Sequence, residues 1–146
     1  MKKLLFILLM SLSCVCFAQN TYNAKLTTDF FGESYQEDIR ARIVVKDSSI
    51  VVYEKKDTAT TILIFYTPLE PTLYGNSTDC IELTPGVYGY DKTYTGYNLV
   101  NREYYILNFR VITTKHSYYL RDIFVIGKLS NGNIQETTTY YHKGQY

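Results

Sequence analysis

Apolar and polar residues alternate along most of the chain after residue 18, and this period of two is typical of β-strands with one face in a core and the other in water. In the segment 39–45, Arg40 and Arg42 alternate with apolar residues. The residues predicted to face inward there are Ile39, Ala41, Ile43 and Val45. A polar turn over 46–49 and a returning strand over 50–54 complete a predicted hairpin.

The last third of the chain predicts two further hairpins. Apolar residues alternate with polar ones over 105–111, and a turn leads to a returning strand over 118–128. The dipeptide Asn131-Gly132 then precedes a predicted strand over 134–141. Asn-Gly between two such runs is the strongest short hairpin signal, because both residues tolerate the positive φ that a type I′ turn requires.

Together these patterns predict one all-β domain of about seven or eight antiparallel strands, connected mainly by hairpins. A meander of that size must close into a barrel or fold into two layers to cover its edges. We therefore predict a small β-barrel, with a two-layer β-sandwich as the alternative. A single turn near residues 33–38 is the best candidate for a helix.

Residues 1–18 depart from this pattern and have the layout of a secretory signal peptide: two lysines, an apolar run, and a small residue, Ala18, at a cleavage site. The apolar run is shorter than the roughly 20 residues that span a bilayer. The junction resembles bacterial leaders, so we expect cleavage near Ala18, a single β domain over 19–146, and a periplasmic or secreted protein. The alternative is an outer-membrane lipoprotein anchored through Cys14. We expect no transmembrane segment after residue 18.

Charge and cysteine content narrow the possible partners. The formal net charge of +1 includes the two leader lysines, so residues 19–146 carry about −1. Nucleic acids and anionic membranes require clustered positive charge, so neither is an expected partner. Cys80 is the only cysteine after the leader and cannot form an internal disulfide, and we interpret it as a buried, inert residue.

Motifs of common enzymes are missing from the sequence, which has no nucleophile elbow, phosphate-binding loop or His-Glu-Xaa-Xaa-His helix. A zinc site needs three or four converging ligands, and the chain has only His116 and His142 as histidines, so we expect no metal and no cofactor. Glycoside hydrolysis needs only two carboxylates. A small hydrolase therefore remains a minor alternative, using two of the acids Asp29, Glu33, Glu37 and Asp38.

Tyrosine is the unusual feature of the composition, with 16 tyrosines and no tryptophan. The segment 85–97 combines tyrosines with glycines. It is either an edge strand with turns, whose tyrosines cover the end of the barrel, or an open, mobile surface that contacts sugars, peptides or proteins. A second irregular stretch, 67–76, contains two prolines. If both loops lie at one end of the barrel, they form an aromatic rim consisting of Tyr74, Tyr88, Tyr90, Tyr94 and Tyr97.

We therefore expect an exported, non-catalytic binding module whose loops contact a glycan, peptide or protein of the cell envelope. The alternative is a lipocalin-like carrier of a small apolar ligand, although the strand-one tryptophan of the lipocalins is missing. Bulky inward residues such as Leu107 and Phe124 suit a filled interior better than a large pocket. The triplet Asp57-Thr58-Ala59 resembles a bacterial O-glycosylation acceptor.

Overall fold

The computed structural model describes residues 19–75, 81–114 and 121–144, and the predictions about the leader, Cys14, Cys80 and His116 lie outside these residues. The described part of the chain contains ten strands and no helix, and therefore no helix that is long and apolar enough to cross a membrane. The strands are β1 (Gln19–Asp29), β2 (Ser34–Val45), β3 (Ser49–Lys56), β4 (Ala59–Tyr66), β5 (Thr72–Tyr74), β6 (Ile81–Thr84), β7 (Val87–Asn98), β8 (Glu103–Thr114), β9 (Arg121–Ser130) and β10 (Asn133–Tyr141).

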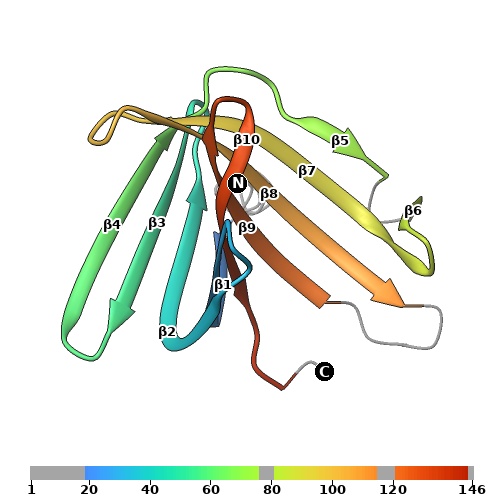
Figure 1. Ribbon diagram of the computed structural model, residues 1–146, viewed down its shortest axis with the longest axis horizontal. Helices are drawn as coiled ribbons and strands as arrows, with labels where there is room; N and C mark the ends of the chain where they lie inside the picture. The colour runs from blue at the N-terminus through green and yellow to red at the C-terminus, as the bar shows by residue number, and fades with distance from the viewer. Residues whose placement is uncertain (1–18, 76–80, 115–120, 145–146) are drawn as a thin grey trace, which may run out of the picture.

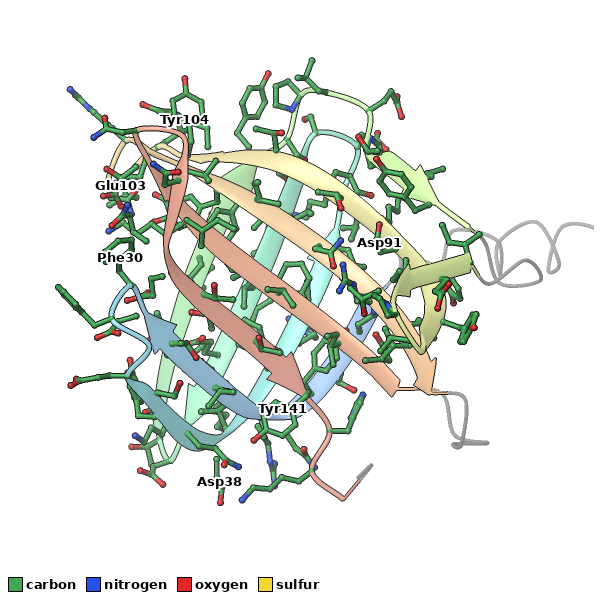
Figure 2. The ribbon with its side chains drawn as sticks, turned by 45° about the vertical axis from the view of Figure 1, so that its right-hand side comes forward. Phe30, Asp38, Asp91, Glu103, Tyr104 and Tyr141 are labelled. Carbon is green, nitrogen blue, oxygen red and sulfur yellow. The ribbon has the colours of Figure 1, made fainter. Side chains whose placement is uncertain are left out.

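The strands form one antiparallel sheet that closes into a ring, which confirms the predicted all-β barrel (Figure 1). Its order is β4-β3-β2-β1-β10-β9-β8-β7-β5, with β6 also paired to β7. The short β5 and β6 account for the excess over the expected number of strands, since the other eight form the wall of the barrel. In Figure 2, β7–β10 lie toward the viewer with β1 beside β10, and β3 and β4 lie behind them.

The two closures of the ring differ greatly in extent. The first and last strands pair over six residue pairs, from Ala24↔Tyr141 to Asp29↔Glu136. By contrast, β4 meets β7 only where Tyr66 pairs with Tyr97. Beyond that point β7 pairs instead with β5 and β6, and β4 diverges from it (Figure 1).

The core lies inside the barrel and follows the predicted alternation. Ile43 is fully buried, whereas its neighbour Arg42 is exposed. The largest fully buried side chains come from both halves of the sheet, and they are Tyr140, Phe65, Phe124, Ile43, Ile50, Leu107 and Val52. Such a core fills the middle of the barrel and leaves space only toward its ends.

The structure confirms one predicted turn, at Asn131-Gly132, and contradicts the helical turn predicted near residues 33–38. Asn131 and Gly132 have φ values of 51° and 77°, which confirms the predicted hairpin turn. The suggested helical turn near 33–38 is wrong, because β2 begins at Ser34. Asp29 ends β1 by accepting hydrogen bonds from the backbone N–H groups of Phe31 and Glu33, which leads the chain directly back into a strand.

Candidate functional site

The tyrosine- and glycine-rich segment 85–97 is mostly strand β7, which agrees with its interpretation as a strand with a turn rather than as an open loop. Gly86 lies in the turn before β7 with a φ of 78°, whereas Gly89 and Gly96 permit close packing within the strand. A Cβ on Gly96 would lie 2.8 Å from Leu107 Cδ1 and 3.2 Å from Phe65 Cβ, and one on Gly89 would collide with the Val111 carbonyl. The β-forming tyrosines and threonines therefore determine the local structure.

The structure places the five predicted rim tyrosines on two different faces of the sheet. Tyr88, Tyr90 and Tyr94 share the inward face of β7 with alternate spacing, and Tyr94 is only 7% exposed within the core. Tyr97 lies on the outer face, where its ring is 4.9 Å from that of Tyr104. Tyr74 is exposed on β5 opposite Asp91. The five residues do not form one rim.

A cavity of about 230 Å³ lies inside the barrel at the end where the β1–β2, β7–β8 and β9–β10 turns gather. Figure 2 shows Phe30 and Glu103 at this end. We call this space the mouth cavity, and its lining residues are Lys25, Thr27, Tyr35, Glu54, Leu63, Phe65, Asn98, Asn101, Tyr105, Ile126, Lys128, Glu136, Thr138 and Tyr140.

Strand alternation explains why these residues share one cavity. Glu54 continues the inward set of Ile50 and Val52 along β3. On β10, Thr138 lies two residues from the buried Tyr140 and two from Glu136, so all three face inward. The interior therefore changes from apolar at its middle to polar at the mouth.

The first of two polar clusters in the mouth cavity is centred on Lys25. Its Nζ lies 3.3 Å from each Glu54 carboxylate oxygen and 3.3 Å from Glu37 Oε2. Lys56 Nζ approaches the other Glu37 oxygen at 2.7 Å, and the Tyr140 hydroxyl donates a short hydrogen bond to Glu54 Oε1. These contacts join four strands, which are β1, β2, β3 and β10.

The environment of this cluster shifts the pKa values of Glu37, Lys25 and Tyr140. Hydrogen bonds from Lys56 and Lys25 lower the pKa of Glu37, so it is ionised at neutral pH. Burial lowers the pKa of Lys25, but the adjacent Glu54 and Glu37 together outweigh burial and leave the pKa above its ordinary value. Burial, and then Glu54, raise the pKa of Tyr140 far above its usual range, so its hydroxyl remains a donor.

The second polar cluster lies across the mouth cavity. Lys128 Nζ is 3.0 Å from Glu103 Oε1, and the Tyr105 hydroxyl donates to Glu103 Oε2 at 3.1 Å. Asn101 Nδ2 donates to the same hydroxyl at 2.7 Å, and burial raises the pKa of Tyr105. The Tyr105 ring packs 5.0 Å from that of Phe65, so the cluster lies directly beside an apolar wall.

One carboxylate of the mouth cavity accepts no hydrogen bond from the described residues. Glu136 is exposed at the opening and interacts with Lys128 through charge alone, without a hydrogen bond or a close ion pair among the described residues. The cavity and its immediate ion-pair partners combine Lys25, Lys56 and Lys128 with four glutamates, which leaves an excess of one negative charge.

The entrance has an apolar rim. The β1–β2 turn exposes Phe30 and Phe31, whose rings make an edge-to-face contact at 5.7 Å. The β7–β8 turn exposes Leu99 and Val100. A molecule entering the mouth cavity therefore passes apolar turn residues before it reaches the carboxylates.

Three of the four acids considered for hydrolysis are engaged in other contacts. Glu37 is held by two lysines inside the barrel, whereas Asp38 faces outward and pairs with Lys143. Asp29 is occupied in the β1–β2 turn. Within the described ranges, no three His, Cys, Asp or Glu side chains gather so that they could hold a metal ion.

Three further hollows lie on the outside of the barrel. A groove of about 510 Å³ runs past Arg40, Lys55 and Asp57, which are exposed side chains of mixed charge. A pocket of about 380 Å³ lies beside Arg42 and Tyr53, and one of about 280 Å³ lies beside Asp91 and Arg110. Of these four spaces along the described residues, the mouth cavity combines enclosure by the barrel wall with a polar network already held in place.

No protein-family model, curated protein or solved structure matches this chain. The case for a function therefore depends on the geometry of the mouth cavity.

Proposed function

We propose that this protein is a non-catalytic binding protein that takes a small hydroxyl-bearing molecule, a carbohydrate unit, into the mouth cavity. The observation that carries the proposal is the position of hydrogen-bonded carboxylates next to an apolar wall inside the barrel. This moves the proposed contact surface from the tyrosine-rich segment to the interior of the barrel.

The chemistry of the cavity suits a sugar ring. Sugar hydroxyls are donors, and the carboxylates of Glu54 and Glu136 are acceptors. The C–H faces of a sugar ring are apolar, and Phe65, Leu63 and Ile126 supply an apolar surface in the same cavity. The excess of one carboxylate disfavours a ligand that is itself anionic.

The ion pairs support binding because they fix the acceptors before the ligand arrives. Lys25 and Tyr140 hold Glu54 from two sides, so its carboxylate loses little freedom on binding. Affinity improves when such ordering precedes binding. The cavity is slightly smaller than the usual range of about 300 to 1,000 Å³ for small-molecule sites, which fits one sugar unit better than a larger molecule.

The filled middle of the barrel does not favour a lipocalin-like carrier of an apolar ligand. Tyr140, Phe65 and Phe124 occupy the space that a long apolar ligand would need. We place the protein in the cell envelope, where glycans are available, because residues 1–18 have the layout of a signal peptide.

The test is titration calorimetry, with NMR spectra of the same samples, against neutral monosaccharides and their matched uronic acids. We expect at least one neutral sugar to bind with a Kd of about 1 mM or tighter, and its uronic acid to bind at least tenfold more weakly. The Glu136→Gln variant should weaken binding, whereas Asp47→Asn, at an exposed position in the turn between β2 and β3, should not. The proposal fails if no neutral sugar shifts resonances of residues around the mouth cavity.

A further inference from the structure

Strand β4 has a free edge along most of its length. It pairs with β3 through all eight residues, from Ser49↔Tyr66 to Lys56↔Ala59. On its other side the pairing within the described residues is limited to Tyr66↔Tyr97. Along this edge, the backbone N–H and C=O groups of residues 59–65 therefore pair with no other strand of the described part of the chain (Figure 1).

The outer face along this edge is apolar and exposed. Ile62 is 55% exposed, Ile64 54% and Tyr66 47%. Their cross-strand neighbours on β3 include the apolar Val51 and the half-buried Tyr53. The rings of Tyr97 and Tyr104 lie on the same side of the β4–β7 junction and extend the apolar surface.

The edge lacks the features by which proteins usually prevent strands from pairing. Exposed edge strands are normally short, bulged, or protected by charged residues or proline. The sequence of β4, Ala-Thr-Thr-Ile-Leu-Ile-Phe-Tyr, contains neither charge nor proline, and its pairing with β3 has no register shift. An edge of this kind is suited to receive another strand.

We propose that two copies of this protein associate through antiparallel pairing of their β4 strands. Seven free residues centred on Ile62 can pair with themselves about a two-fold axis perpendicular to the sheet, so that each Ile62 faces Ile62 of the second copy. Each Thr60 then faces Ile64 of the second copy on the same outer face. No charge on the strand opposes the pairing of identical edges, and closed two-fold contacts of this self-complementary kind are the commonest in oligomers.

This association is independent of the proposed ligand site. The side chains that β4 contributes to the mouth cavity, Leu63 and Phe65, point into the barrel. Pairing uses the free edge and the opposite, outer face. A failure of sugar binding would therefore leave the dimer intact, and a failure of the dimer would leave the mouth cavity unchanged.

The first test is sedimentation equilibrium of the purified protein and of its Ile62→Lys variant. We expect a dimer for the natural sequence and a dimer dissociation constant at least 100-fold higher for Ile62→Lys. Ile134→Lys serves as the matched control, because Ile134 is equally exposed on β10, away from this edge. Circular dichroism of each variant verifies that it is folded.

The second test identifies the register. In a background lacking the natural cysteines, Ile62→Cys should oxidise to a covalent dimer at least tenfold faster than Thr21→Cys, which is exposed on β1. The proposal is overturned if the natural protein stays monomeric up to about 200 µM, or if its dimer withstands Ile62→Lys, or if the two cysteine variants cross-link at the same rate.

Discussion

The hydroxyl of Tyr140, on the last strand, donates a hydrogen bond to the carboxylate of Glu54, on the third strand, across 86 positions of sequence. This contact spans the interior of the barrel between strands that are not neighbours in the sheet. It links the apolar core, to which the Tyr140 ring belongs, with the polar network of the mouth cavity.

Replacing Tyr140 with Phe should therefore destabilise the protein while keeping the ring in place. Glu54 loses a buried donor, and a hydrogen bond to a charged group contributes about 1.5–3 kcal/mol. We expect the free energy of unfolding in urea to fall by about 1–2 kcal/mol. The control is Tyr104→Phe, at an exposed position, which should change it by less than about 0.5 kcal/mol. Equal effects of the two variants would contradict the role assigned to the Tyr140 hydroxyl.

The pKa of Glu37 makes a specific contribution to acid sensitivity. Since Lys56 and Lys25 lower its pKa in the folded protein, its stabilising effect is complete above the ordinary value of 4.5 and is lost as the pH falls through the lower, folded value. The Glu37→Gln variant should thus lose less stability than the natural protein between neutral pH and acid. Urea unfolding at a series of pH values measures this difference, and Glu33→Gln, in the exposed turn, should retain the natural profile.

Gly96 and Gly127 make a matched pair for testing how tightly the strands pack. A methyl group on Gly96 would press on Leu107 and Phe65, whereas one on Gly127 would meet Ile134 Cδ1 at an ordinary 3.5 Å. Gly96→Ala should lower the free energy of unfolding by about 1–3 kcal/mol. Gly127→Ala should leave it unchanged or raise it by up to about 1 kcal/mol. The reverse order would show that the β4–β7 junction is looser than described.

Asp91 and Arg110 form an ion pair on the outer wall at 3.0 Å, with Asp91 buried and Arg110 about one-third exposed. Asp91 Oδ1 and Arg110 Nε are both buried without a hydrogen-bond partner among the described residues. Removing either side chain leaves the other with an uncompensated charge. In a double-mutant cycle with Asp91→Ala and Arg110→Ala, we expect a coupling energy of about 1–2 kcal/mol, and a value near zero would contradict the pairing.

The all-β barrel could be predicted because nearly every strand follows a simple alternation. The segment around Ile43 shows it, and so does the Asn131-Gly132 turn with its two positive φ values. The tyrosine-rich segment could be interpreted either as a strand or as an open loop, since its glycines resemble those of loops. Their actual role, allowing Leu107 and Phe65 to approach Gly96, depends on strands that are distant in sequence.

The mouth cavity could be predicted from the sequence only in part. Glu54 is two residues beyond Val52, so alternation alone places its side chain inside the barrel. A charged residue at an inward position indicates a polar site, because unpaired charges are rarely buried. What could not be foreseen is that Lys25 and Tyr140 would reach it, because their positions depend on the pairing of β1 with β10. Local sequence patterns do not determine which residues of the first strand pair with which residues of the last strand when the ring closes.

The pairing of β1 with β10 also sets the order of events when the protein is made. Ala24 has its partner at Tyr141, so synthesis must proceed through Tyr141 before the ring can close. A nascent chain that lacks β10 has an unpaired β1 edge and an interior without Tyr140. Closure is thus delayed until β10 has been synthesised, and the contacts that complete the ring are among the most distant in sequence, which favours slow folding.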